Sequence, residues 1–306
     1  MKYLSLICIL LFATTAGLAQ SSLEYSFDIQ FAELPNETKV AYIDQGEAEQ
    51  TLILIHGLGS YLPGWSMNID ALADHFRVVA LDLPGYGKSS KNADNHTIPF
   101  FAESISQLMD HLEIAKATLV GHSMGGQVAL YMAAHSPGRV QRLVLSAPAG
   151  FEQFSEAHYE MFQATVSAEG IASTTDSMIE QNMKVNFYQF PESAVFMVED
   201  RKAIKNDPNF EDYAQAQSQS VFAMLNEPVW DLLPEIEQPT LVIYGNQDAL
   251  IPNRYLNPQL TTKAVAEAGV ERMPNAELNM IDQAGHFVHF EQAEIFNQAV
   301  IKFLNH

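Results

Sequence analysis

The chain has 306 residues, 47% of which are hydrophobic, and its formal net charge is −21. A surface this acidic repels phosphate backbones and anionic lipid headgroups, so we exclude nucleic-acid binding. Cys8 is the only cysteine and lies in an apolar N-terminal stretch, so the remainder of the chain has neither disulfides nor a catalytic thiol.

The first 19 residues have the pattern of an export signal. Lys2 precedes an apolar run over residues 4–12, and Gly17-Leu18-Ala19 is typical of a cleavage site before Gln20. The run is shorter than the ~20 residues that span a bilayer, so we expect cleavage rather than anchoring. The pattern predicts export to the periplasm or the medium, without a stable membrane anchor.

Strand and helix patterns alternate along the rest of the chain, which is typical of a parallel sheet with helices on both faces. We expect strands at residues 25–31, 40–44, 51–56, 76–81, 117–120, 142–145, 240–244 and 277–281. The clearest helical patterns cover residues 65–75, 100–112, 124–135 and 295–304. The sequence therefore predicts an α/β fold with a mostly parallel, eight-stranded sheet.

The alternation of strand and helix patterns stops between residues 151 and 238. This stretch is rich in Met, Phe, Tyr, Gln and Glu, and its apolar residues have helical spacing. We interpret it as a helical lid over the sheet edge, in which Phe151, Phe154, Met161 and Phe162 are candidates to line an acyl pocket. The chain then divides into a signal peptide (1–19), a first core part (20–150), the lid (151–238) and a second core part (239–306).

A candidate nucleophile lies in Gly121-His122-Ser123-Met124-Gly125-Gly126, between the strand at 117–120 and the helix at 124–135. The G-x-S-x-G pattern at a strand-to-helix turn is typical of a nucleophile elbow, where flanking glycines avoid steric clashes and the serine hydroxyl lies over a helix N-terminus. The sequence thus predicts Ser123 as the nucleophile.

A serine nucleophile needs a base, and His286 is the candidate because it follows the last predicted strand, after the flexible Gly285. His289 is the nearest competitor, and we interpret it as structural, at the start of the terminal helix. His122 is too close to Ser123 in sequence to bend back onto it, so we expect it to pack at the elbow.

The acid that orients the base is expected after an earlier strand, in the chain order Ser, acid, His. Asp248 follows the strand at 240–244 directly and fits this position. Asp282 is the runner-up, although it lies only four residues before the base, and Asp231 is a more remote third candidate.

Two backbone N–H groups are needed to stabilise the oxyanion of a tetrahedral intermediate. Met124, the residue after the nucleophile, is expected to supply one. The second is expected from the loop His56-Gly57-Leu58-Gly59, with Leu58 preferred and Gly57 as the alternative. We expect His56 itself to brace this loop.

With these motifs the chain resembles the α/β-hydrolase family. The resemblance rests on His56–Gly59, Asp82–Ser89, Gly121–Gly126, Gly245–Asp248 and Gly285-His286. It is closest to the branch of small esterases, carbon–carbon bond hydrolases and cofactor-free perhydrolases. It implies a Ser-His-Asp triad without metal or organic cofactor, and structural roles for Asp82 and Gly85 beside the site.

The main expectation is an exported serine hydrolase that cleaves small to medium carboxylic esters through an acyl-enzyme on Ser123. A carbon–carbon hydrolase acting on a vinylogous diketone is an alternative, although export counts against it because ring-cleavage intermediates arise inside cells. An acyltransferase or perhydrolase would use the same triad with another acceptor. A non-catalytic binding protein that kept the fold is the alternative of another class. The expected partner is a small-molecule ester, and the oligomeric state is left open.

Overall fold

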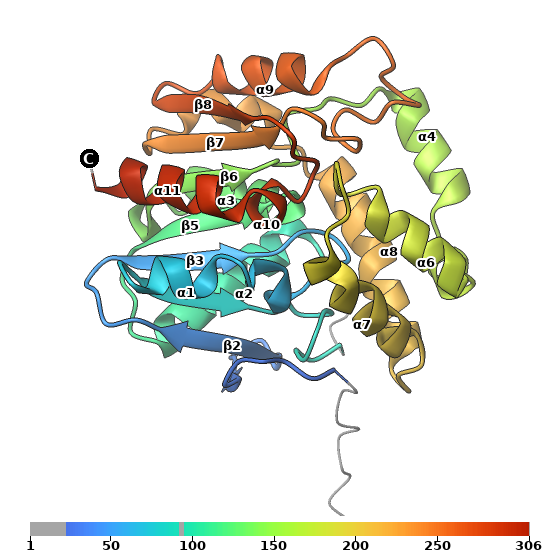
Figure 1. The fold of residues 1–306 in the computed structure, drawn as a ribbon, viewed down its shortest axis with the longest axis horizontal. Helices are drawn as coiled ribbons and strands as arrows, with labels where there is room; N and C mark the ends of the chain where they lie inside the picture. Colours follow the sequence, from blue (N-terminus) through green and yellow to red (C-terminus); the bar gives the residue numbers. More distant parts are fainter. Residues whose placement is uncertain (1–22, 92–94, 306) are drawn as a thin grey trace, which may run out of the picture.

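The computed structural model describes residues 23–91 and 95–305. Its centre is an eight-stranded sheet with the strand order β1-β2-β4-β3-β5-β6-β7-β8 (Figure 1). The strands are β1 (Gln30–Glu33), β2 (Lys39–Gln45), β3 (Thr51–Ile55), β4 (Arg77–Leu81), β5 (Ala117–His122), β6 (Val140–Ser146), β7 (Thr240–Gly245) and β8 (Ala276–Ile281). Only β1 and β2 pair antiparallel with their neighbours, so the predicted mostly parallel sheet of eight strands is confirmed.

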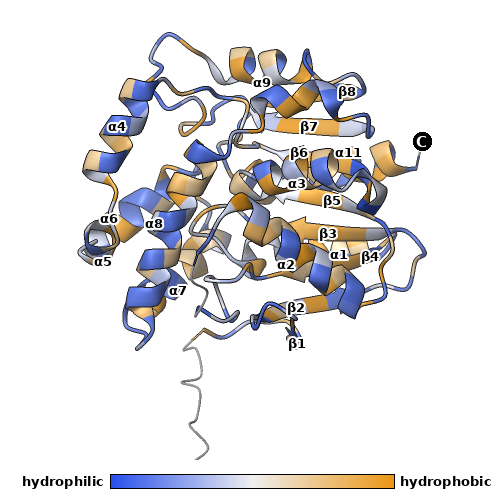
Figure 2. Cartoon of the chain, turned by 180° about the vertical axis from the view of Figure 1, so that it is seen from behind, coloured by the Kyte–Doolittle hydropathy of each residue, from blue (hydrophilic) through white to orange (hydrophobic). Residues whose placement is uncertain are grey.

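Both faces of the sheet are buried, which explains the nearly continuous apolar strands. In β3, Ile53 and Ile55 pack into the cluster under α2 and α3, whereas Leu52 and Leu54 pack into the cluster under α1 and α11. Successive side chains of a strand point to opposite faces, so one strand supplies both layers. In Figure 2 the central strands β3, β5 and β7 are accordingly coloured largely orange, whereas the helices carry both orange and blue stretches.

The covering helices are short to medium in length. One face carries α2 (Ile98–His111), α3 (Met124–His135) and α9 (Thr262–Val270), and the other carries α1 (Ile69–Ala73) and α11 (Ala293–Leu304). The short α10 (Val288–Glu291) leads into α11. No helix within residues 23–91 and 95–305 is long and apolar enough to cross a bilayer.

Two predicted elements differ from the structure by more than two residues at an end or by a break. The first strand begins at Gln30 instead of residue 25, because pairing with β2 starts with Gln30 opposite Tyr42. The helix predicted over residues 65–75 is broken into a 3-10 turn, Leu62–Trp65, and α1. The break lies at Asn68, whose side-chain amide donates to the His289 carbonyl at 2.7 Å and the Asn297 amide oxygen at 2.8 Å.

Between β6 and β7 the chain forms helices, as the sequence predicts. They are α4 (Glu156–Thr165), α5 (Ala168–Ala172), α6 (Asp176–Lys184), α7 (Val195–Lys205) and α8 (Phe210–Asn226). We call them the inserted helices. Figure 1 shows them gathered beside one edge of the sheet, in green to light orange. The 3-10 turn Trp230–Glu235 then returns the chain to β7.

Candidate active site

Ser123 lies between β5 and α3 with backbone angles φ 52° and ψ −117°. A positive φ costs a non-glycine residue on the order of 1–3 kcal/mol, and it is kept only where the surroundings impose it. Here the surroundings are tight, because a Cβ on Gly121 would lie 2.4 Å from the Gly125 carbonyl oxygen. A Cβ on Gly125 would lie 2.3 Å from the carbonyl oxygen of Ile55. The turn is therefore built as a nucleophile elbow requires.

His286 and Asp248 form a buried pair beside this elbow. His286 Nδ1 lies 2.8 Å from Asp248 Oδ2, and both side chains are buried. The other carboxylate oxygen, Oδ1, accepts from the backbone N–H groups of Leu250 at 2.8 Å and Ile251 at 3.0 Å. A carboxylate fixed in this way keeps the imidazole proton on Nδ1 and leaves Nε2 free to act as a base.

The side chains of the two other candidate acids contact residues other than His286. Asp282 accepts a hydrogen bond from the side chain of Asn246. The Asp231 side chain is 97% exposed and lies 3.7 Å from Arg272. Of the three candidates, the structure therefore brings only Asp248 onto His286.

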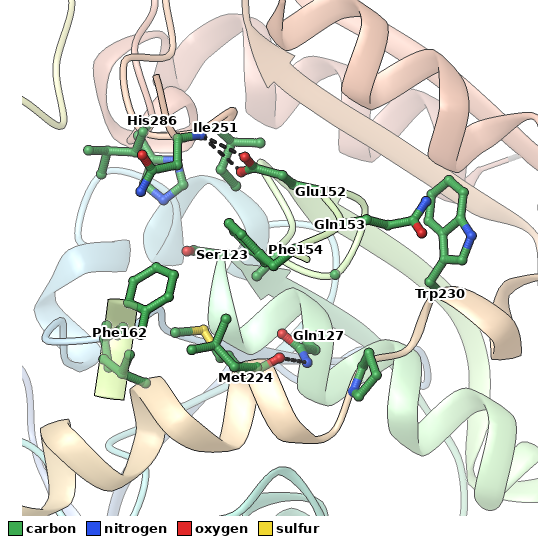
Figure 3. Close-up of a pocket in the computed structure, with 18 of the residues that line it drawn as sticks. Ser123, Gln127, Glu152, Gln153, Phe154, Phe162, Met224, Trp230, Ile251 and His286 are labelled. Carbon is green, nitrogen blue, oxygen red and sulfur yellow. Dashed lines mark hydrogen bonds between the residues drawn. The ribbon is translucent and has the colours of Figure 1, made fainter. Parts of the chain in front are cut away.

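Ser123 and His286 line the same cavity, which has a volume of about 580 Å³. Figure 3 shows the hydroxyl of Ser123 and the ring of His286 at one side of this cavity, with Trp230 across it. Among the hydrogen bonds of the described residues, none joins the Ser123 hydroxyl to His286. Such contacts are often long in enzymes without substrate and shorten when substrate binds.

The expected oxyanion donors also meet at the elbow. Leu58 lines the cavity, and a Cβ on the adjacent Gly57 would lie 3.0 Å from the Cβ of Ser123. Met124 is the first residue of α3, where backbone N–H groups have no partner within the helix. The loop and the helix end therefore both lie against Ser123.

His56 braces the loop that carries Leu58. Its Nδ1 donates to the Gly57 carbonyl at 2.8 Å, and its Nε2 accepts from the Leu83 N–H at 3.0 Å. Burial lowers the pKa of His56 to about 4, so this ring stays neutral near pH 7. Its expected bracing role agrees with these contacts.

His122 and His289 lie behind His286 and are buried. His122 Nε2 donates to the backbone carbonyl of His286 at 3.1 Å, and burial holds its pKa well below the ordinary value. Nδ1 of His289 shares a hydrogen bond of 3.1 Å with the Ser146 hydroxyl, and burial lowers the pKa of His289 to about 3. Neither ring contacts Asp248, so His286 is the base candidate that the geometry favours.

Asp82 is a buried structural anchor rather than a reacting group. Its carboxylate accepts from the Tyr25 hydroxyl at 2.8 Å and from the backbone N–H groups of Leu62 at 2.6 Å and Lys88 at 2.7 Å. Burial raises its pKa. The carboxylate thus ties the chain after β4 to the turn that follows the Leu58 loop.

Of the four expected pocket residues, Phe154 and Phe162 line the cavity and form an edge-to-face pair with ring centroids 5.8 Å apart. Phe151 does not line it, because its ring packs on Gly269 of α9. Met161 lies on the outer side of α4 and is 42% exposed. Many of the remaining lining residues were not predicted, among them Gln127, Glu152, Gln153, Val221, Met224, Leu225, Trp230 and Asn253.

A second, smaller cavity of about 50 Å³ shares Leu58, Asn186 and Phe287 with the large one and contains Arg201 of α7. The Nη2 atom of Arg201 donates to Gln217 at 2.5 Å, whereas Nη1 is buried without a partner. None of the ion pairs within residues 23–91 and 95–305 involves Arg201.

Burial lowers the pKa of Arg201 to about 10, which still leaves it cationic at neutral pH. The side chain as a whole is partly buried and lies over the Tyr213 ring, but no anion accompanies its charge, and an anionic ligand would compensate the buried Nη1 atom. Sequence reasoning missed it. The sequence could have indicated it, because Arg201 is a charged residue that follows Met197 and Val198 and precedes Ile204, the buried apolar residues of α7.

No group of three or more His, Cys, Asp or Glu side chains in the described part of the chain is arranged to hold a metal ion.

Comparison with known proteins shows to which family the chain is similar. The family model described as alpha/beta hydrolase fold matches residues 50–293. The chain is 31% identical over 290 residues to a 2-hydroxy-6-oxononadienedioate/2-hydroxy-6-oxononatrienedioate hydrolase of Burkholderia vietnamiensis, which covers 90% of this chain and 94% of that one. A probable hydrolytic enzyme of Pseudomonas aeruginosa has the same fold, with a TM-score of 0.83, 24% identity and coverage of 92% and 96%.

The chain is also similar to part of a longer protein. It is 35% identical over 263 residues to the dihydrolipoyllysine-residue acetyltransferase component of the acetoin cleaving system of Pseudomonas putida. The match covers 85% of this chain but 64% of that protein, less than two thirds of its length.

The prediction of export is wrong. A match over 90% of the chain to a bacterial hydrolase of 2-hydroxy-6-oxo acids, the alternative with which export is at odds, overturns it. Residues 1–19, from which export was predicted, lie outside the described residues.

Proposed function

Because the chain belongs to the α/β-hydrolase family, we propose that it is a serine hydrolase that breaks a carbon–carbon bond in a 2-hydroxy-6-oxo acid. In this proposal Ser123 is the nucleophile, His286 the base and Asp248 the group that orients it, with Leu58 and Met124 as oxyanion donors. The proposal replaces ester cleavage as the main activity, because a relative that the chain matches over nearly its whole length hydrolyses such an acid.

The observation that carries the proposal is the unpaired Nη1 atom of Arg201. Arg201 lines the small cavity, which adjoins the large cavity at Leu58, a residue of the loop beside the nucleophile. A guanidinium binds a carboxylate with charge-assisted hydrogen bonds. A substrate whose carbonyl carbon reaches Ser123 and whose carboxylate reaches Arg201 would satisfy both groups. A simple neutral ester would leave Arg201 unpaired.

The large cavity favours an uncharged group at the other end of the substrate. Its walls include Glu152 and Asp231, and no arginine or lysine of the described residues lines it. Burial raises the pKa of Glu152, whereas its hydrogen bonds from Asn257 and from the Asn253 N–H, at 2.9 and 3.0 Å to the two oxygens, favour the ionised form. Phe154, Phe162 and Trp230 supply aromatic surface. We therefore propose a monoanionic substrate with an aryl or alkyl group on C6, in preference to a dicarboxylate.

The chemistry then follows from the residues present. The substrate reacts in its 2,6-diketo form, and the Ser123 oxygen attacks C6 while His286 takes the hydroxyl proton. The C6 oxyanion accepts from the N–H groups of Leu58 and Met124. When the intermediate collapses, the C5–C6 bond breaks, and its electron pair is delocalised along the conjugated chain to the oxygen on C2.

The proton held by His286 then passes to this leaving group, which departs as a 2-hydroxydienoate. His286 next deprotonates a water molecule, which attacks the acyl group on Ser123. The acid formed from C6 leaves, and the proton returns to the Ser123 oxygen. One water is consumed, and no oxidant or reductant is required.

Ester hydrolysis is the second candidate, and the size and apolar lining of the large cavity favour it. It needs the same attack and the same oxyanion donors, with an alcohol in place of the carbon leaving group. Transfer of the acyl group to another acceptor would share these steps as well. We further propose that the inserted helices act as a lid within residues 151–238, between core parts 20–150 and 239–306, and that the partner is a small molecule.

The test uses the full chain with 2-hydroxy-6-oxo-6-phenylhexa-2,4-dienoate and, in parallel, p-nitrophenyl butyrate. Chromatography should show benzoate and 2-hydroxypentadienoate in equal amounts, and Ser123→Ala should abolish both. If only the ester is turned over, carbon–carbon cleavage is refuted and ester hydrolysis takes its place. If neither substrate reacts and a fluorophosphonate does not label the chain, the protein is a binder rather than a hydrolase.

A further inference from the structure

The loop that carries His286 is tied to the segment at residues 186–189 on both sides of that residue, through Glu291 of α10 on one side and directly on the other. Before it, the Gly285 N–H donates to Glu291 Oε2 at 2.8 Å. After it, the Phe287 N–H donates to the Asn186 carbonyl at 3.0 Å. Residues 186–189 connect α6 to the turn before α7, so the contact joins the two parts of the fold.

Glu291 lies at the centre of this contact. Besides Gly285, its carboxylate accepts from the Tyr188 N–H at 3.0 Å and the Gln189 N–H at 2.6 Å. Three backbone donors from two separate segments thus share one side chain. Backbone N–H groups in loops need acceptors, and an ionised carboxylate is the strongest that a protein offers.

Packing reinforces the same junction. The rings of Phe187 and Phe287 stack with centroids 5.3 Å apart. A Cβ on Gly285 would lie 2.7 Å from the Asn186 carbonyl oxygen and from the Tyr188 nitrogen, so the two backbones are in direct contact. Since His286 sits between the two tethered residues, any shift of the segment at 186–189 must move the imidazole.

We propose that Glu291 is a positioning residue, whose carboxylate locks the His286 loop to residues 186–189, so that docking of the inserted helices and alignment of His286 with Asp248 are one event. Glu291 acts through the backbone of Gly285 and does not touch substrate. The proposal rests on the proposed role of His286 as the base. It also implies that any opening of the lid takes place away from residues 186–189.

The test compares Glu291→Ala and Glu291→Gln with Glu294→Gln as the matched control. Glu294 is three residues further along on α11, is exposed, and accepts only from the side chain of Gln298. A misplacement of about 1 Å costs on the order of 100-fold in rate, so kcat should fall by about that factor in Glu291→Ala with KM changed much less. Glu291→Gln should be intermediate, since its amide keeps one acceptor oxygen, and Glu294→Gln should match wild type.

A spectroscopic readout separates positioning from loss of fold. The proton between His286 Nδ1 and Asp248 should give a low-field ¹H NMR signal in wild type and Glu294→Gln. That signal should broaden or shift in Glu291→Ala while circular dichroism is retained. Gly285→Ala, which pushes the segments apart and keeps the carboxylate, should reproduce the effect.

If Glu291→Ala keeps both the wild-type kcat and the NMR signal, the positioning role of Glu291 is refuted, and the proposed triad is unaffected. If wild type itself shows no fluorophosphonate labelling of Ser123, the proposed function has failed instead. The two failures are therefore distinguishable.

Discussion

Replacement of Arg201 by methionine removes the one cation that faces the candidate site from the inserted helices. Methionine keeps an unbranched, flexible side chain and the helix propensity of α7. A hydrogen bond to a charged group is worth about 1.5–3 kcal/mol. At 1.36 kcal/mol for each tenfold change, kcat/KM for the 6-phenyl acid should fall by about 10- to 150-fold.

The stability of the variant should change much less. Burial lowers the pKa of Arg201 to about 10, so removal of the charge relieves part of its desolvation cost. The substitution also loses the hydrogen bond to Gln217 and the contact with the Tyr213 ring, 4.5 Å away, and these losses oppose that relief. We expect the free energy of unfolding to stay within about 2 kcal/mol of wild type, as urea denaturation would measure.

A matched substrate isolates the charge. The methyl ester of the 6-phenyl acid replaces the carboxylate by a neutral group that is one methyl larger, and benzoate release reports cleavage of either compound. Wild type should prefer the acid, and Arg201→Met should not discriminate between them. Arg272→Met, on the Trp230 side of the large cavity, should keep the wild-type preference. An equal loss for acid and methyl ester in Arg201→Met, or no loss for either, would refute the reasoning.

Three further expectations can be checked with the same materials. Asp248→Asn should lower kcat by about 10⁴-fold with the fold intact, because the amide favours the wrong imidazole tautomer, and unchanged turnover would exclude Asp248 as the orienting acid. Glu152→Gln should raise kcat/KM for a dicarboxylate substrate relative to the monoanionic 6-phenyl acid, because it removes a like charge from the cavity wall. An unchanged ratio of the two kcat/KM values in competition assays would show that Glu152 does not discriminate against dicarboxylates. His56 and His289 have native pKa values of about 4 and 3, below the unfolded value of about 6.5, so the unfolded chain binds more protons and stability falls with pH below 6.5. Each histidine should lower the free energy of unfolding by about 2 kcal/mol between pH 7 and pH 5, as urea denaturation would measure. A free energy of unfolding that does not change over that range would contradict the burial of these rings in the neutral form.

The sheet could be predicted because strands buried on both faces are continuous apolar runs, as in β3 and β7. Ser123, Asp248 and His286 could be predicted because each follows a strand of the sheet, and the carboxyl ends of parallel strands meet at one edge. The break near Asn68 could not, because its amide bonds to residues more than 200 positions away.

The cavity was harder to predict than the triad. Phe151 and Phe154 are three residues apart in an irregular segment, and only the packing against Gly269 decides which of them faces the cavity. Arg201 and Glu291 are ordinary charged residues in the sequence. Their importance comes from what surrounds them, an unpaired nitrogen in one case and three converging N–H groups in the other.

The most direct test of the central claim is site-resolved labelling with a fluorophosphonate probe, followed by peptide mass spectrometry. The account predicts that one label is found, on Ser123, in wild type, and that labelling slows by orders of magnitude in His286→Ala. Labelling of another residue, or a rate that does not depend on His286, would contradict it.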